Sequence, residues 1–238
     1  MKVTTYALAL GAALALAGTA QAQDFQVKEK GLLMLNVRAT AISPTADDAI
    51  TTAGGAPTGL HVDVKDDYKP SLGLSYFLTD HVAVEVIATT SQHTIKAQGP
   101  GTDVTVHKTW VLPPVVSLQY HFAPSAKISP YVGAGVNYML FHSGKDQNGF
   151  KVKLDDGFGY ALQAGVDVAV KGPWSANLDV KKVFFETDAK INGGALKSKV
   201  KLDPWVLSVG FGYKFEPATR RRGGPIQRSA HPRWPEPP

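Results

Sequence analysis

WVLSVGFGYKF, at residues 205–215, is the stretch that decides the fold. Every second residue, from Trp205 to Phe215, is large and apolar, and the residues between them are mostly small or polar. This period of two predicts a β-strand. A strand with lipid on one side and a packed polar lumen on the other has this composition. The stretch therefore predicts one strand of a transmembrane β-barrel, which requires further strands upstream and export of the chain.

The first residues carry the features of an export signal. Lys2 is followed by an apolar run at 6–17 and by the small-x-small sequence Ala20-Gln21-Ala22. The run is too short for a spanning helix, although an N-terminal anchor helix is the alternative. We therefore predict a cleaved signal peptide at 1–22, a barrel domain at 23–215 and a disordered Pro/Arg-rich tail at 216–238.

Composition fits a barrel better than a helical membrane protein. The mean hydropathy is −0.09 and the chain has no cysteine. Apolar and polar positions average out in a barrel, and a barrel is closed by hydrogen bonds instead of disulfides. The net charge of +5 resides mainly in Lys2 and the tail arginines, which leaves 23–215 nearly neutral. A nucleic-acid partner is therefore not expected.

Eight alternating segments predict an all-β fold, an eight-stranded antiparallel transmembrane β-barrel. The segments are 32–42, a stretch that ends with 71–76, 82–86, 110–122, 131–141, 157–170, 174–190 and 205–215. Short turns follow the second, fourth and sixth segments. Mostly longer, polar loops follow the others, at 43–60, 98–101, 142–155 and 192–201. This asymmetry is typical of outer-membrane barrels and puts both termini on the periplasmic side.

Aromatic residues gather near both ends of the predicted strands, as expected of belts at two membrane interfaces. The predicted inner belt includes Phe77 and Tyr131, and the predicted outer belt includes Phe185.

Several short motifs, in order along the chain, resemble the OmpW/AlkL family of small outer-membrane proteins. They are YFLTD at 76–80, Val84-Glu85, His93, LPP at 112–114, QYHF at 119–122, PYVGAGVNY at 130–138, the stretch 159–167, DPW at 203–205 and YKF at 213–215. The resemblance covers nearly the whole predicted barrel. It implies location in the outer membrane of a Gram-negative cell, a narrow and partly apolar lumen, and passage of small hydrophobic molecules. The residues after Phe215 depart from the family pattern, which usually ends at that aromatic position.

Inward-facing polar residues predict a plugged lumen. By alternation the lumen receives Arg38, Glu85, Gln119, Asn137, Gln163, Asp167, Asp179 and Lys181. Opposite charges can pair in a barrel whose interior is just wide enough for side chains. The alternative is that these groups only hold the barrel together. Met34 and Met139 also face inward and could line an apolar path or simply pack.

A plugged lumen requires another exit for a solute. Pro113 and Pro114 each remove a hydrogen-bond donor from the fourth predicted strand, so together they are expected to open the barrel wall. We expect an apolar solute to leave sideways into lipid there, unless the pair merely begins the membrane-embedded part of the strand. His93 lies near the outer end of the third strand and could line the entrance or have a structural role.

Other functions are less well supported by the residues. We find no Gly-x-Ser-x-Gly, His-Glu-x-x-His or P-loop motif, so no catalytic residue, metal ligand or cofactor is expected. A lipid-modifying barrel enzyme and a non-transporting surface receptor or structural barrel are the alternatives. Lysines enrich two loops and suit contact with lipopolysaccharide phosphates, at positions Lys145, Lys151, Lys153, Lys197, Lys199 and Lys201.

Overall fold

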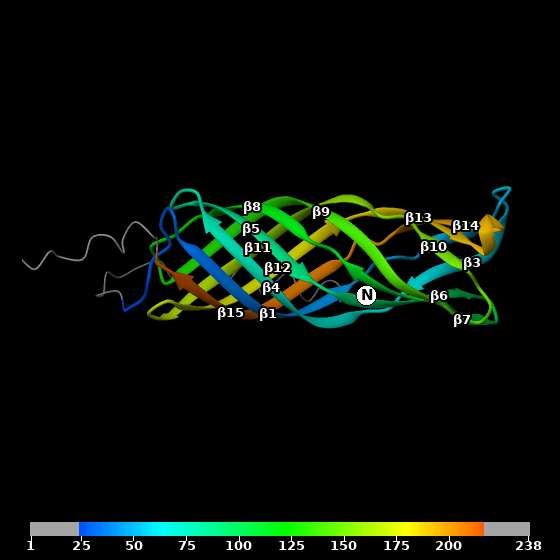
Figure 1. The fold of residues 1–238 in the computed structure, drawn as a ribbon, viewed down its shortest axis with the longest axis horizontal. Helices are drawn as coiled ribbons and strands as arrows, with labels where there is room; N and C mark the ends of the chain where they lie inside the picture. The colour runs from blue at the N-terminus through cyan, green and yellow to red at the C-terminus, as the bar shows by residue number, and fades with distance from the viewer. Residues whose placement is uncertain (1–23, 217–238) are drawn as a thin grey trace, which may run out of the picture.

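The computed structural model describes residues 24–216, and these form a closed antiparallel β-barrel with an extension at one end (Figure 1). Eight strands close the barrel. They are β1 (Leu33–Ser43), β4 (Asp67–Phe77), β5 (Val82–Thr89), β8 (Val115–His121), β9 (Ile128–Asp146), β11 (Gly157–Lys171), β12 (Trp174–Phe184) and β15 (Trp205–Phe215). The predicted eight-stranded fold is confirmed. The predicted signal peptide and tail lie outside the described residues, except Glu216.

The first and last strands close the barrel. β1 and β15 pair antiparallel along their whole length, from Leu33 opposite Phe215 to Ser43 opposite Trp205. Small residues permit this close approach, because a Cβ atom at Gly210 would lie 2.0 Å from the carbonyl oxygen of Val37. The pairing places the start of β1 and the end of β15 at the same end of the barrel, beside its short turns (Figure 1).

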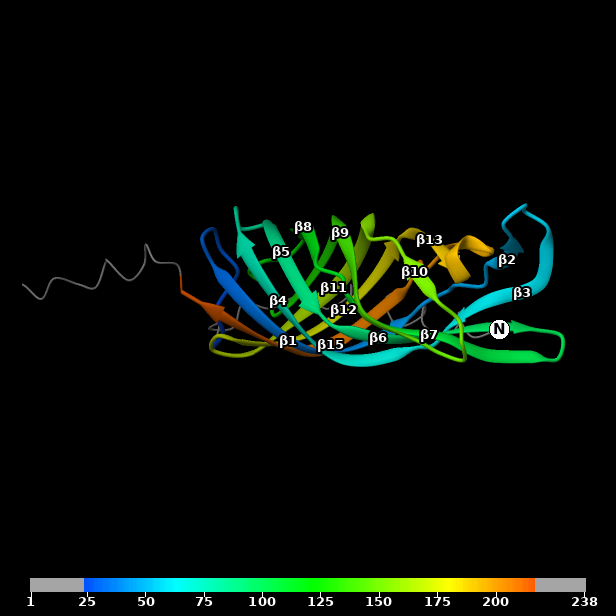
Figure 2. The ribbon, with the colours of Figure 1, turned by 45° about the vertical axis from the view of Figure 1, so that its right-hand side comes forward.

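The predicted polar loops are wrong in part, because strands continue the wall beyond the closed barrel (Figure 2). The additional strands are β2 (Ala49–Thr52), β3 (Pro57–Val64), β6 (Ser91–Gly99), β7 (Thr102–Leu112), β10 (Val152–Leu154), β13 (Glu186–Ile191) and β14 (Leu196–Lys201), and a short 3-10 turn η2 (Asn192–Gly194) joins the last two. The upper part of β9 pairs with β7. Buried apolar side chains from these strands, among them Ile50, Val62 and Ile95, form a common core. Burial of this core explains why segments rich in polar residues are ordered as strands.

Two segments predicted as single strands are each divided. The segment 110–122 is interrupted at Pro113 and Pro114, between β7 and β8, because neither proline has an N–H for the ladder. The segment 174–190 is interrupted at Phe185, whose N–H donates to the Asp203 carboxylate at 2.9 Å. At this point the chain changes its partner strand. β12 pairs with β15, whereas β13 pairs with β14.

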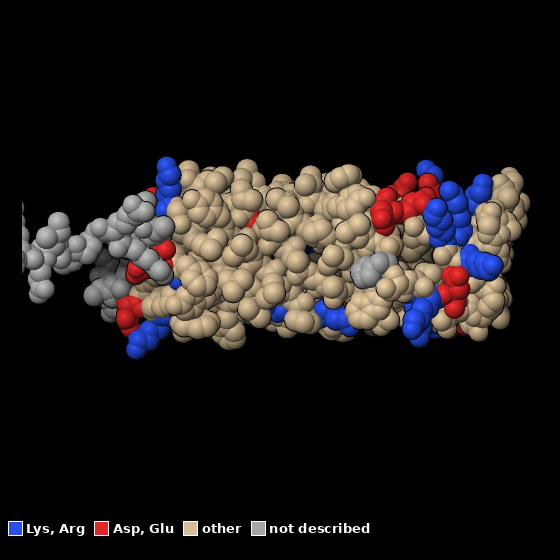
Figure 3. All heavy atoms as spheres, viewed as in Figure 1, with Lys and Arg blue, Asp and Glu red and all other residues tan. Residues whose placement is uncertain are grey.

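The face of the barrel in Figure 3 has a band with few charged atoms, which is bounded at both ends by clusters of Lys, Arg, Asp and Glu. Its exposed apolar side chains include Leu72, Leu118, Val136, Leu162 and Phe211. This band suits the hydrocarbon region of a bilayer. None of the described residues forms a helix that is long and apolar enough to cross a membrane.

Exposed aromatics lie at both ends of this band, including Tyr120, Phe122 and Trp174 at the short-turn end and Tyr68, Phe158 and Trp205 at the other. Three aromatic residues predicted for the belts, namely Phe77, Tyr131 and Phe185, are instead buried inside. Each of the three falls on an alternate position whose side chain faces the lumen. Alternation, and not position along the strand, therefore decides whether an aromatic side chain faces lipid or the interior.

Candidate functional site

The lower half of the lumen is filled by a network of buried ionic and polar side chains. The Glu85 carboxylate lies 2.8 Å from the Arg38 guanidinium and 3.3 Å from the Lys181 ammonium. Gln163 donates to Glu85 at 3.1 Å and to Asp179 at 2.9 Å. Buried charges are tolerated when they are paired and hydrogen-bonded in this way. We call these five residues the polar floor.

A lysine from before the first strand closes the lumen below the polar floor. Lys28 donates to Asp167 at 2.6 Å and to Ser129 at 2.8 Å, and it lies 2.9 Å from Nδ1 of His121. Gln119 lies beside His121, with 3.2 Å between Oε1 and Nε2. Sequence reasoning missed Lys28, because it precedes every alternating segment and no spacing assigns it to a face.

Above the polar floor lies an apolar cavity of about 60 Å³, which we call the lower cavity. Its walls include Ile87, Val115, Met139 and Val183, and its lining reaches Asn137 and Lys181. A second space of about 30 Å³, the upper cavity, lies within the extension. It is lined mainly by apolar side chains, including Ile50, Val62, Val106, Ile191 and Val200.

The two cavities share His93, Val111 and Leu202 in their linings. His93 is buried in β6, outside the membrane-spanning strands, with its ring nitrogens 3.0 Å from the Ser91 hydroxyl and 3.1 Å from the Lys65 carbonyl oxygen. Burial lowers the pKa of His93 below its ordinary value, which keeps the ring neutral at neutral pH. These shared side chains lie between the two cavities, which are therefore neighbours along the lumen.

The barrel wall is interrupted beside the lower cavity. The β5–β8 ladder ends at Ile87 opposite Val115, and the β6–β7 ladder begins at Ser91 opposite Val111. Pro113 lies between these ladders and lines the lower cavity, as does Thr89 across the interruption. We call this interruption the wall break. On the other side of the wall break, the segment with the two prolines remains bonded to β9, because the Tyr138 N–H donates to the Pro114 carbonyl at 3.2 Å.

The structure separates the predicted path residues into three groups. His93, Pro113, Asn137 and Met139 line a cavity, whereas Arg38, Glu85, Gln119 and Gln163 lie in or below the polar floor. Pro114 lines neither cavity, and Met34 lies away from both, packed with Leu32, Phe77 and Ala83. The part that each residue has in solute passage stays a prediction.

The upper cavity was also missed from the sequence. Its signal is apolar alternation beside the predicted loops, as at Val62 and Val64, at Ile95 and Ala97, and at Ala189 and Ile191. Within residues 24–216, no three His, Asp or Glu side chains are grouped so that they could hold a metal ion.

A closed barrel with an apolar outer band, two aromatic interfaces and a polar interior defines an outer-membrane β-barrel protein. The family model of the OmpW family matches residues 29–215, and the chain belongs to that family. It is located in the outer membrane.

Relatives and a solved structure agree with this assignment. The chain is 39% identical to the uncharacterized outer-membrane protein y4mB of Sinorhizobium fredii, over 78% of this chain and 81% of the relative. It is 33% identical to outer membrane protein W of Escherichia coli, over 90% of this chain and the full length of the relative. The crystal structure of OprG from Pseudomonas aeruginosa is similar with a TM-score of 0.75 and 29% identity, over 81% of this chain and 99% of OprG.

Proposed function

We propose that this barrel is a channel for small hydrophobic molecules that releases them sideways into the membrane. A solute enters through the extension, passes the upper and lower cavities, and leaves at the wall break. The observation that carries the proposal is the position of the wall break, beside an apolar cavity whose floor is closed by paired charges.

The polar floor makes straight passage into the periplasm costly. An apolar solute would have to displace Glu85 from both Arg38 and Lys181, and each separated charge would be left buried. Leaving a buried charge without its partner costs several kcal/mol, about 3–5 kcal/mol in proteins. A solute that leaves at the wall break exchanges an apolar cavity for lipid and pays no such cost.

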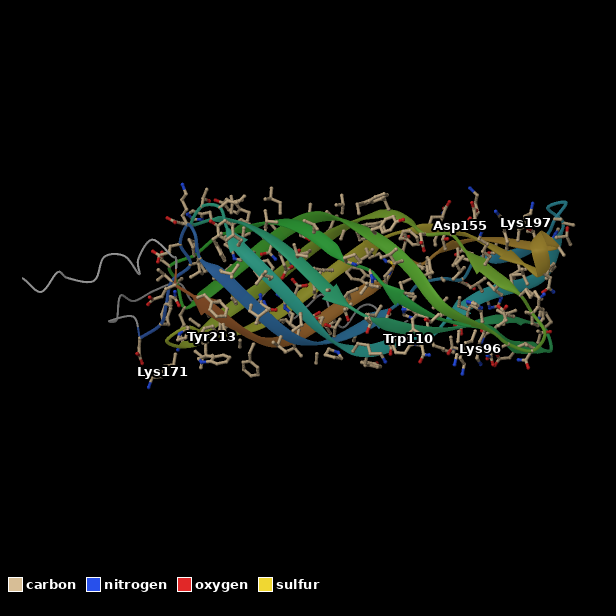
Figure 4. All side chains as sticks on the ribbon, viewed as in Figure 1. Lys96, Trp110, Asp155, Lys171, Lys197 and Tyr213 are labelled. Carbon is tan, nitrogen blue, oxygen red and sulfur yellow. The ribbon has the colours of Figure 1, made fainter. Side chains whose placement is uncertain are left out.

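The height of the wall break also favours release into lipid. Trp110, at the end of β7, precedes Pro113 by three residues, and its ring packs beneath the ammonium of Lys69 with 5.7 Å to the centroid. Trp110 therefore lies near the outer interface, where tryptophan settles in membranes (Figure 4). The wall break comes next along the chain, so it lies slightly closer to the hydrocarbon region than Trp110 does.

The name of one relative supports an apolar solute. The chain is 27% identical to the dibenzothiophene metabolism operon protein PahQ of Pseudomonas aeruginosa, over 74% of this chain and 85% of that protein. Dibenzothiophene is a sulfur-containing aromatic compound with no charge, so its chemistry is of the kind that the cavities suit.

Whole-cell uptake separates this proposal from its alternatives. The chain is expressed in a Gram-negative host that lacks its own OmpW-family protein, and uptake of naphthalene is compared with uptake of a small sugar. We expect expression to raise the entry of naphthalene about tenfold, a barrier lower by ~1.4 kcal/mol, and to leave sugar entry unchanged. Entry of the sugar alone would replace the proposal with a general pore. Entry of neither would favour a surface receptor or structural barrel.

We also propose that the extension contacts lipopolysaccharide phosphates. Lys153 lies opposite Lys190 in the β10–β13 pair, and Lys190 lies opposite Lys197 in the β13–β14 pair, so three exposed lysines form a row. Lys197 is at the end of the extension, and Asp155, 3.9 Å from Lys190, lies closer to the barrel (Figure 4). Like charges directly opposite one another destabilise a sheet, so the row favours an anionic partner.

Replacing the three lysines of this row by glutamine is expected to weaken binding of purified lipopolysaccharide about tenfold at low salt. The matched control replaces Lys199 and Lys201, which lie opposite Asp188 and Glu186. This control should change the affinity much less, because its lysines already face acidic partners. An equal loss in both variants, measured by fluorescence titration, would contradict a dedicated phosphate-binding row.

A further inference from the structure

The lower cavity contains one polar side chain whose hydrogen-bonding capacity is unused. Asn137 lies on β9 with 1% of its surface exposed, and it lines the cavity just above the polar floor. Neither its Oδ1 nor its Nδ2 has a hydrogen-bond partner among the described residues. A buried carboxamide without partners is costly, so this group is expected to have a ligand in the working protein.

The position of this carboxamide is fixed by a glycine on the neighbouring strand. Gly159 lies directly opposite Asn137 in the β9–β11 pair, and a Cβ atom at Gly159 would lie 2.5 Å from Oδ1 of Asn137. Only a residue without a side chain leaves room for the carboxamide there. The barrel wall thus accommodates the Asn137 side chain without giving it a partner.

The other polar side chains that line the lower cavity are already engaged. Thr40 bonds to Ser71 and Ser208, and Thr89 bonds to the carbonyl of Pro70. The remaining pairs are Ser91 with His93, and Lys181 with both Glu85 and Asp179. Among the described residues of this lining, Asn137 alone therefore offers a free donor and a free acceptor.

We propose that Asn137 binds the hydroxyl group of a small, uncharged amphipathic solute, an alcohol or a phenol, whose apolar body lies against Ile87, Val115, Met139 and Val183. This inference rests on the proposed channel function and names its preferred solute class. A hydroxyl group can donate to Oδ1 and accept from Nδ2, so it satisfies both free atoms. A hydrocarbon satisfies neither atom.

The charges of the polar floor argue against an ionised head group. Arg38 and Lys181 are matched by Glu85 and Asp179, so no charge near Asn137 is left to neutralise an anion or a cation. An ion that loses its water without gaining a counter-ion is strongly disfavoured. A neutral hydroxyl group costs much less to desolvate and recovers its hydrogen bonds at Asn137.

Phenol and toluene form a matched pair of probes, because they differ mainly in the hydroxyl group. The full chain, labelled with ¹⁵N-asparagine, is placed in lipid nanodiscs, and the side-chain amide signals are followed by NMR. The Asn137 signal is the one that disappears in Asn137→Leu. We expect phenol to shift this signal strongly and to saturation, as a new hydrogen bond does, and toluene to shift it much less. We also expect Asn137→Leu to weaken phenol binding about five- to a hundredfold, the range for two net hydrogen bonds, without weakening toluene binding.

Asn36→Leu is the control, since Asn36 is buried in the same lumen but does not line the lower cavity. It should leave phenol binding unchanged. The inference is overturned if phenol leaves the Asn137 signal unmoved, as it would if Asn137 holds water only, or if Asn36→Leu has the same effect as Asn137→Leu. If Asn137→Leu does not fold, Asn137→Ser identifies the signal in the same way, and the signals of the unaltered chain with the two probes then decide. Cellular uptake with no shift at Asn137 would overturn this site alone, whereas a shift without any uptake would overturn the proposed channel.

Discussion

Glu85→Gln is expected to lower the free energy of unfolding by about 3–5 kcal/mol, the usual cost of removing one member of a buried ion pair. Glu85 is fully buried and has Arg38 at 2.8 Å and Lys181 at 3.3 Å. The glutamine amide keeps the shape of the side chain but removes its negative charge. The buried cations Arg38 and Lys181 then lose the carboxylate that they share. Urea unfolding in lipid vesicles, followed by tryptophan fluorescence, measures the change.

Asp63→Asn is the control for the loss of one carboxylate from an ion pair. Asp63 pairs with Lys65 at 2.7 Å on the extension, where the lysine side chain is 53% exposed. A pair so open to water contributes far less to stability than a buried pair. If Glu85→Gln cost no more than this control, the polar floor would not be the stable barrier that lateral release requires.

Replacing Pro113 and Pro114 together by valine is expected to reduce naphthalene uptake about tenfold, equivalent to a barrier raised by ~1.4 kcal/mol. Valine restores the two N–H donors that proline lacks and favours a continuous strand between β7 and β8. The ladders that now stop at Val111 and Val115 could then join across the wall break. The whole-cell assay described above measures the effect.

Pro130→Val is the control for a proline that lies in an intact ladder. Pro130 is in β9, opposite Val166, at the periplasmic end and away from both cavities. It should not alter uptake. Unchanged uptake in the Pro113 and Pro114 double variant, with normal amounts in the outer membrane, would remove the wall break from the route.

Alternation was sufficient to predict the membrane-spanning part of the fold. The strand at 205–215 and its pairing with β1 follow from period-two patterning, because one face meets lipid and the other a crowded lumen. The same parity predicted that Arg38, Glu85 and Gln163 face inward, which the structure confirms. The presence of two adjacent prolines correctly indicated an interruption of the wall.

The rest of the site depends on contacts that no local pattern contains. Lys28 is placed by Asp167, 139 positions away in the sequence, and Asn137 is distinctive only because its neighbours leave it without a partner. Strands of the extension are rich in polar residues, so most of their inward apolar positions were not recognised until the fold brought them together. Met34 has the predicted inward parity, but its height in the barrel places it below the polar floor instead of beside a cavity.

Reversible closure of the wall break tests lateral release most directly. The chain has no cysteine, so Thr89→Cys with Pro113→Cys introduces a single pair of thiols. Extension of the β5–β8 register beyond Ile87 and Val115 puts these two positions opposite each other, and both line the lower cavity. We expect the oxidised, cross-linked barrel to lose naphthalene uptake and the same sample to recover it after reduction. Equal uptake in the oxidised and reduced states, with cross-linking verified by mass spectrometry, would contradict release through the wall.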